Sequence, residues 1–201
     1  RSVKKHMTNK SWKALQWWAY PFYAITYVHL MLMLGPSLVQ GSLQPIITAC
    51  AEMSATKTGA LIVLAQRSDL SDIIEGGITV DGRLSVALLE NIFFKNAPLH
   101  DGAAIIQNDR VVAAKCILPV TQSPVPKAYG TRHRAAIGLT ETSDAIVVVV
   151  SEETGGISVA FGGKIERNIA PRDLLEAISK HFIDNPEEKE RRIKIRKNNK
   201  R

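Results

Sequence analysis

The chain has 201 residues, of which 45% are hydrophobic, so it can form one domain with a core and a short appendage at either end. Its formal charge of +7 is confined to the ends: residues 1–13 and residues 187–201 each carry +5, which leaves −3 for the segment between them. A mildly acidic body argues against a basic groove for nucleic acid, and it favours end segments that are solvated or rest on anionic lipid or another polyanion.

Residues 17–39 are nearly free of charge and could form a helix that crosses a membrane. Aromatic residues crowd the start of this segment, and Lys10 and Lys13 precede it, as in the cytoplasmic flank of a membrane helix. We therefore expect residues 1–40 to hold a basic flank and an apolar helix that spans the membrane or lies at its surface. The topology stays open between further upstream helices, a helix broken near Pro21, and an inverted orientation.

The cysteines and the histidine of the apolar segment give weak chemical signals. Cys50 and Cys116 lie in apolar stretches without a ligand-type residue at metal-binding spacing, so we predict neither a disulfide nor a zinc site, and both thiols suit a reducing cytosol. His29 allows a haem ligand or a proton-handling group, but a histidine bonded to a neighbouring helix is the simpler interpretation.

The first half of the globular part alternates between helical and extended patterns. Apolar residues recur at helical spacing from Leu43 to Met53, and residues 60–64 are entirely apolar, as in a buried strand. Glycine pairs and Asp81-Gly82 mark turns between the next segments. We predict helices over Leu43–Ala55, Leu70–Glu75 and Ser85–Phe94, and strands over Ala60–Leu64 and Ile78–Val80.

The second half continues the alternation. A hairpin is predicted with strands Ala103–Ile106 and Val111–Leu118 around a turn at Asn108-Asp109, followed by a loop over residues 121–130. Further strands are predicted over Ala145–Val150 and Ile157–Phe161, and helices over Arg132–Thr142 and Arg172–Ile183. Interleaved strands and helices indicate an α/β domain over residues 41–184, between the N-terminal apolar helix and a basic, disordered tail over residues 185–201.

Asp101 is a candidate catalytic residue at the start of a predicted strand. Its carboxylate can bind a divalent metal or help to ionise a hydroxyl, and Gly102 beside it leaves room for a ligand to approach. His100 is a second candidate metal ligand. An Asp-Gly pair also forms ordinary turns, so this motif alone is compatible with a purely structural role.

Gly130-Thr131 leads into a predicted helix whose first turn holds Arg132, His133 and Arg134. Cations are unfavourable at a helix N-terminus, so this cluster favours an anionic ligand such as a triphosphate, which the free backbone N–H groups and the Thr131 hydroxyl would also bind. A solvated basic turn is the alternative.

Ser151-Glu152 follows an apolar strand, at the end where α/β proteins gather ligand-binding groups. Ser151 could bond a phosphate, and Glu152 could share a metal with Asp101 or His100. A plain acidic turn explains this motif equally well.

Three runs of residues together resemble the diadenylate cyclase domain, also called the DisA N-terminal domain, and specifically its membrane-anchored CdaA-type branch. They are Leu99-His100-Asp101-Gly102-Ala103, Gly130-Thr131-Arg132-His133-Arg134-Ala135-Ala136 and Val150-Ser151-Glu152-Glu153-Thr154-Gly155. The resemblance covers residues 43–183, and it implies that residues 41–184 are a diadenylate cyclase domain with a central mixed β-sheet surrounded by helices.

The resemblance implies synthesis of cyclic di-AMP from two ATP molecules, with release of pyrophosphate and a need for Mn²⁺, Mg²⁺ or Co²⁺. Asp101 would help to activate the ribose 3′-hydroxyl. The resemblance also implies metal binding for His100 and Glu152. It implies nucleotide binding for Gly102, Ala103, Leu118, Thr131, Arg132, His133, Arg134 and Ser151.

The resemblance also implies a setting in the cell. Because each 3′-oxygen must attack the other ATP, the reaction needs two half-sites in a face-to-face homodimer. Relatives of the CdaA type work at the cell membrane with a cytoplasmic catalytic domain, together with a YbbR-type regulator and phosphoglucosamine mutase. A nucleotide-binding sensor that does not catalyse is the alternative function.

The sequence departs from the family pattern in two places. Some relatives carry a tyrosine that stacks on adenine next to the Leu118-Pro119 pair, where this chain has Ile117. Membrane-anchored relatives typically have three transmembrane helices, whereas this sequence offers one candidate.

Overall fold

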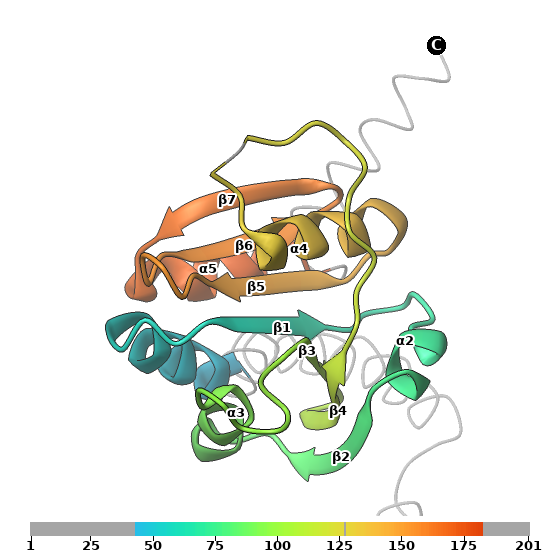
Figure 1. The fold of residues 1–201 in the computed structure, drawn as a ribbon, viewed down its shortest axis with the longest axis vertical. Coiled ribbons are helices and arrows are strands. Elements are labelled where there is room, and N and C mark those ends of the chain that lie inside the picture. The colour runs from blue at the N-terminus through green and yellow to red at the C-terminus, as the bar shows by residue number, and fades with distance from the viewer. Residues whose placement is uncertain (1–42, 127, 183–201) are drawn as a thin grey trace, which may run out of the picture. The chain divides into compact units, whose positions relative to one another are not determined.

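The computed structural model describes residues 43–126 and 128–182 (Figure 1). The predicted apolar helix with His29, and the predicted tail over residues 185–201, lie outside the described residues. Within the described ranges, none of the helices has both the length and the apolar character that a membrane crossing requires.

A seven-stranded sheet forms the centre of the described part, with the strand order β2-β4-β3-β1-β5-β6-β7. Its strands are β1 (Ala60–Leu64), β2 (Ile78–Arg83), β3 (Ala103–Gln107), β4 (Arg110–Cys116), β5 (Ile146–Val150), β6 (Ile157–Phe161) and β7 (Lys164–Ile169). β1 and β3 run parallel, and every other neighbouring pair is antiparallel. The sheet is therefore mixed, as the family resemblance implied.

Helices cover both faces of this sheet (Figure 1). The helix over residues 43–55, α3 (Val86–Phe93) and α5 (Leu174–Ser179) pack on one face, whereas α2 (Ser71–Glu75) and α4 (Thr131–Thr142) pack on the other. β1 shows why both faces need cover, because its side chains alternate between the two hydrophobic clusters and all five residues are buried. The predicted α/β arrangement is confirmed.

Several element ends differ from the sequence predictions. β2 continues through the predicted turn at Asp81-Gly82, where the register shifts and Asp81 adopts a φ of 43°, a conformation that aspartate tolerates better than most residues. The C-terminal helix is shorter than predicted: Pro171–Asp173 form a 3₁₀ turn before α5.

β7 was not predicted at all. Its sequence carries charged or polar residues at four of six positions, and it forms an edge of the sheet, where such residues are tolerated. A strand at the sheet edge lacks the continuous apolar run by which the central strands were recognised.

Two local predictions hold. Ser85 caps α3, because its side chain accepts a hydrogen bond from the backbone N–H of Leu88. Cys50 and Cys116 are free and buried, and burial raises the pKa of the Cys50 thiol to about 12 and that of Cys116 to about 11. Both thiols are therefore held in the protonated, unreactive form.

Candidate active site

The sheet register brings two of the three motifs, and the segment after β4, to one end of the sheet. Ala60 at the start of β1 pairs with Val150 at the end of β5, and Ala103 at the start of β3 pairs with Cys116 at the end of β4. The parallel pairing of β1 with β3 joins these two pairs side by side. The segments at this end are therefore Asp101-Gly102 before β3, Ile117-Leu118 after β4 and Ser151-Glu152 after β5.

Asp101 and Gly102 make the sharp entry into β3. Asp101 is exposed to solvent, and Gly102 has a φ of +113°, which side chains other than hydrogen rarely allow. A Cβ on Gly102 would lie 2.8 Å from the carbonyl oxygen of Cys116. Glycine therefore lets β3 approach the end of β4 while the neighbouring carboxylate stays accessible.

His100 is oriented by the backbone. Its Nδ1 lies 2.6 Å from the carbonyl oxygen of Ala97, and since a carbonyl only accepts hydrogen bonds, Nδ1 carries the proton. The lone pair of the neutral imidazole is then on Nε2. A backbone contact of this kind commonly orients histidine for metal binding, so His100 suits the predicted role of ligand.

The segment after β4 packs on α4. Leu118 is buried, whereas Ile117 is 83% exposed. The backbone N–H of Thr121 donates to the carbonyl of Arg134, and the Thr121 hydroxyl donates to Glu141. The segment that carries Ile117 and Leu118 is thus hydrogen-bonded, through Thr121, to the helix that begins with the basic motif.

The first turn of α4 is open to an anion. Gly130 is its N-cap, has an extended conformation and provides no side-chain hydrogen bond to the helix, and the first turn contains no acidic residue. The N–H groups of Thr131 and its neighbours therefore add to the positive end of the helix dipole. These N–H groups are available to an anionic ligand, and the phosphate site stays a prediction.

The three consecutive basic residues have three different environments. Arg134 is exposed, Arg132 is partly buried and forms an ion pair with Glu152, with 2.8 Å between Nη1 and Oε2, and His133 is only 5% exposed. A Cβ on Gly59 would lie 2.9 Å from Nη1 of Arg132, so the backbone before β1 closely flanks this ion pair. The structure thus pairs two residues that were predicted to contact different ligands.

His133 turns into the protein. Its Nε2 lies 3.4 Å from the hydroxyl oxygen of Ser158, and its ring centroid is 5.8 Å from that of Tyr129. Burial lowers the pKa of His133, the positive charge of Arg167 lowers it further, and the carboxylate of Glu153 partly opposes them.

Ser151 organises the turn after β5. Its hydroxyl accepts a hydrogen bond from the N–H of Thr154, and its backbone N–H donates to the carbonyl of Gly156. The Ser54 hydroxyl donates to the carbonyl of Gly155 and ties this turn to the helix over residues 43–55. Ser151 is half-buried at the same end of the sheet as Asp101.

Tyr129, Ser158 and Arg167 contact this site or one another, and none was singled out from the sequence. Tyr129 precedes the basic motif directly, which was an available signal. Ser158 and Arg167 lie on β6 and β7, and only the packing of α4 on these strands brings them to the motif.

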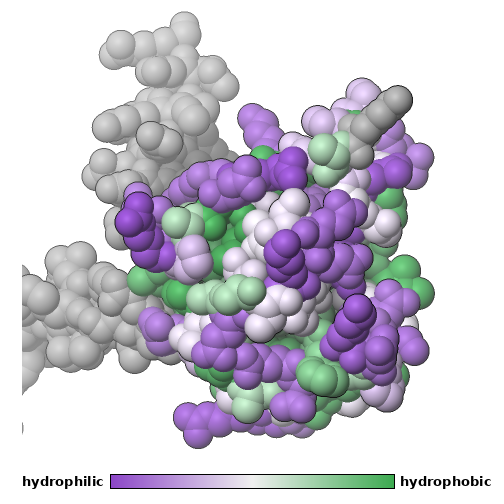
Figure 2. Space-filling view, turned by 60° about the vertical axis from the view of Figure 1, so that its left-hand side comes forward, coloured by the Kyte–Doolittle hydropathy of each residue, from purple (hydrophilic) through white to green (hydrophobic). Residues whose placement is uncertain are grey.

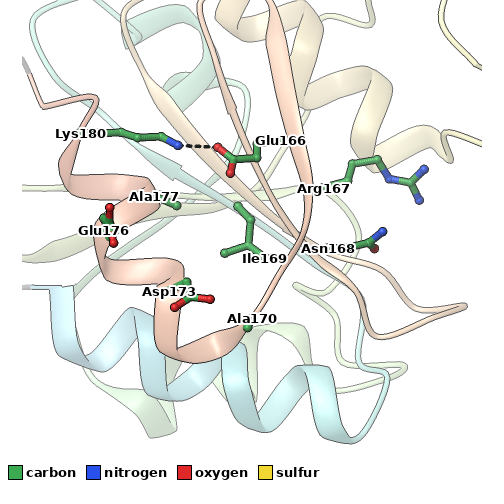
Figure 3. A pocket seen from close by; sticks show the side chains of 9 residues that line it. All are labelled: Glu166, Arg167, Asn168, Ile169, Ala170, Asp173, Glu176, Ala177 and Lys180. Carbon is green, nitrogen blue, oxygen red and sulfur yellow. Dashed lines mark hydrogen bonds and ion pairs between the residues drawn. The ribbon is translucent and has the colours of Figure 1, made fainter.

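Among the described residues, no three His, Cys, Asp or Glu side chains gather in a group that could hold a metal ion. A polar cavity of about 360 Å³ lies between β7 and α5, and none of the predicted site residues lines it (Figure 3).

Comparison with known proteins identifies the family. The family model described as DisA bacterial checkpoint controller nucleotide-binding, or DAC, matches residues 47–165. Cyclic di-AMP synthase CdaA of Bacillus subtilis is 42% identical over 147 residues, which are 73% of this chain and 54% of that protein. A diadenylate cyclase of Listeria monocytogenes is 44% identical over 132 residues, 65% of this chain and 48% of that protein.

A solved structure agrees with this result. A double mutant of DacA from Staphylococcus aureus has 45% sequence identity and a TM-score of 0.69, covering 72% of this chain and 97% of that one. The chain belongs to the DAC family and is of the CdaA type, which confirms the resemblance. It spans about half the length of the first two curated relatives.

Proposed function

We propose that the protein is a diadenylate cyclase, which joins two ATP molecules into cyclic di-AMP and releases two pyrophosphates. One observation carries the proposal: the register of β1, β3, β4 and β5 puts Asp101, Leu118 and Ser151 at the end of the sheet where Glu152 pairs with Arg132 of α4. The names of the CdaA and diadenylate cyclase relatives support the same reaction.

The start of α4 binds the triphosphate. Its N–H groups and the Thr131 hydroxyl donate hydrogen bonds to phosphate oxygens, and Arg132 and Arg134 add charge-assisted bonds. Ser151 contributes a further hydroxyl from the neighbouring turn. The buried side chain of Leu118 offers an apolar surface for adenine, and the exposed Ile117 beside it gives contact without aromatic stacking.

Asp101 accepts the proton of the ribose 3′-hydroxyl. The freed oxygen forms a bond to the α-phosphorus of the other ATP, the bond from that phosphorus to the bridging oxygen breaks, and pyrophosphate leaves. Gly102 and Ala103 let the nucleotide approach the backbone. The reverse attack between the same two molecules closes the ring.

The described residues gather no group of three protein ligands, so Mn²⁺, Mg²⁺ or Co²⁺ would be held by one or two of the predicted ligands, Nε2 of His100 and the Glu152 carboxylate, together with phosphate oxygens of ATP. The cation supplies charge neutralisation on the phosphates and favours ionisation of the hydroxyl. When the cation and the triphosphate bind, the Glu152 carboxylate gains the cation as a partner and the Arg132 guanidinium gains the phosphates.

The cell membrane is the proposed location, with the catalytic domain on the cytoplasmic side and attachment through residues 1–40. One relative supports this location by its description, a hypothetical membrane spanning protein from Bacillus cereus with 41% identity and a TM-score of 0.61, which covers 74% of this chain and 79% of that one. A face-to-face homodimer, and control by a YbbR-type regulator and phosphoglucosamine mutase, belong to the same proposal.

The test is synthesis of cyclic di-AMP from ATP and Mn²⁺, detected by mass spectrometry. Asp101→Asn removes the proton acceptor and should lower the rate by about 10²- to 10⁴-fold, while binding of unreactive 3′-deoxy-ATP changes little. Asp109→Asn is the matched control, since it makes the same chemical change at the opposite end of β3 and keeps a residue that tolerates its φ of 59°.

Equal rates for Asp101→Asn and the unmodified protein would remove the role assigned to Asp101. If 3′-deoxy-ATP binds but ATP gives no cyclic product at any protein or metal concentration, the nucleotide-binding sensor would be favoured instead.

A further inference from the structure

Arg167 is a partly buried cation on β7 that the proposed reaction does not use. Its side chain points away from the Glu166–Lys180 ion pair and from α5 (Figure 3). Ile165, two residues earlier and therefore on the same face of the strand, packs against the hydrophobic cluster under α4. Arg167 thus faces the side of the sheet that α4 covers.

The guanidinium of Arg167 stacks on Tyr129. Its central carbon lies 4.9 Å from the centroid of the tyrosine ring. Nε of Arg167 is buried and has no hydrogen-bond partner among residues 43–126 and 128–182. Since Nε makes no hydrogen bond to these residues, contact with the tyrosine ring holds this part of the guanidinium in place. That contact offsets the unfavourable burial of an unpaired donor.

Tyr129 connects Arg167 to the candidate active site. Its ring lies 5.8 Å from that of His133, which in turn contacts Ser158 on β6. Tyr129 also directly precedes Gly130, the N-cap of α4. The Arg167, Tyr129 and His133 side chains therefore form a continuous row of contacts from the sheet edge to the first turn of α4.

This row of contacts fastens the end of a long connection. The connection from β4 to α4 spans residues 117–130 and contains no strand or helix where it is described. Hydrogen bonds of Thr121 and Ser123 fasten its beginning to α4. At its end, the contact of Tyr129 with Arg167 joins it to the sheet.

We propose that Arg167 is a positioning residue for nucleotide binding: by stacking on Tyr129 it holds the start of α4, and with it Thr131 and Arg132, in the arrangement that binds the triphosphate. The inference rests on the proposed function, because it assigns that site a triphosphate ligand. Arginine is needed for its planar group, since lysine keeps the charge but loses the stacking surface.

The experiment measures the dissociation constant of Mg²⁺ and 3′-deoxy-ATP by calorimetry, beside the KM and kcat of cyclic di-AMP synthesis. Arg167→Lys should weaken binding and raise KM by about 2- to 30-fold, with kcat nearly unchanged. Tyr129→Ala should have a similar effect. The double variant should bind 3′-deoxy-ATP no more weakly than the single variant that binds it less tightly, because both substitutions remove the same contact.

Two controls separate positioning from general destabilisation. Tyr129→Phe keeps the aromatic ring and should bind like the unmodified protein. Arg172→Lys makes the same substitution at an arginine whose side chain is 86% exposed and should change nothing. Unchanged affinity in Arg167→Lys, or additive effects in the double variant, would overturn the positioning role while the cyclase assignment stands. Failure of the unmodified protein to bind 3′-deoxy-ATP would overturn both.

Discussion

Neighbouring residues of the same chemical type take different roles once the helix is placed. Arg132, His133 and Arg134 follow one another, but successive residues of an α-helix are rotated by about 100° around its axis, so the three side chains point in different directions. Arg132 meets Glu152, His133 enters the protein beside Ser158, and Arg134 faces solvent. Of the three, we expect the two arginines to bind phosphate and His133 to connect α4 to the sheet.

The buried His133 predicts a pH dependence of stability. Burial and the charge of Arg167 lower the pKa of its imidazole below the ordinary 6.5, so the unfolded chain binds a proton more readily than the folded protein. His133 therefore destabilises the folded state as the pH falls below about 6.5, by at most about 1.4 kcal/mol per pH unit. Urea unfolding between pH 8 and pH 5 measures this slope.

The comparison variant is His133→Gln, which removes the titrating group. Its free energy of unfolding should fall less steeply below about pH 6.5 than that of the unmodified protein. Parallel curves for the two proteins over this range would contradict the assignment of a depressed pKa to His133.

At the scale of the element, α4 combines two functions. Its first turn belongs to the candidate site, and its middle supports the segment that leaves β4. Gly138 makes the second function possible, since a Cβ there would lie 2.3 Å from the carbonyl oxygen of Pro119. The proposed adenine contact at Leu118 and the proposed phosphate contacts at Thr131 are therefore parts of one packed unit.

Gly138→Ala should destabilise the protein although alanine favours helices. The added methyl group would collide with backbone atoms of Pro119 and Thr121, and relief of such overpacking typically costs about 1–3 kcal/mol, more than the gain of about 1 kcal/mol in helix propensity. Gly130→Ala is the control, because its Cβ would meet no atom within 4 Å. Urea midpoints measure both, and equal midpoints would show that the Pro119 segment shifts freely.

At the scale of the whole molecule, the proposed reaction needs two copies of the described domain, and each copy would supply one of the two half-sites. Hydrophilic side chains surround smaller apolar patches on the face shown in Figure 2. The large hydrophobic side chains exposed among the described residues include Ile78, Phe94, Ile117 and Val120, and two of these flank Leu118 in the candidate site. An accessible site of this kind suits a reaction that needs a second copy opposite.

Dilution tests the need for two copies. If two protomers must meet, the rate of cyclic di-AMP formation should rise with the square of protein concentration below the dissociation constant of the dimer, and linearly above it. Light scattering over the same concentrations locates the dimer. A rate that stays linear where the protein is monomeric would exclude the face-to-face arrangement.

The pattern of the sequence was sufficient for the central elements and for the three motifs. Fully apolar runs such as residues 60–64 and 146–150 predict buried strands because few other structures accommodate them, and Ser85 marks a helix start by its capping chemistry. β7 was not predicted, because charged residues are tolerated at a sheet edge and its apolar pattern is therefore weak.

Residue types and spacing alone determined which family the chain resembles and which chemistry its motifs allow. Tertiary structure alone decided that Arg132 pairs with Glu152, that His133 is buried, and that Arg167 reaches Tyr129. The physical reason is that these contacts join segments 20 to 38 residues apart, and their distances depend on strand register and helix packing, which no local pattern encodes.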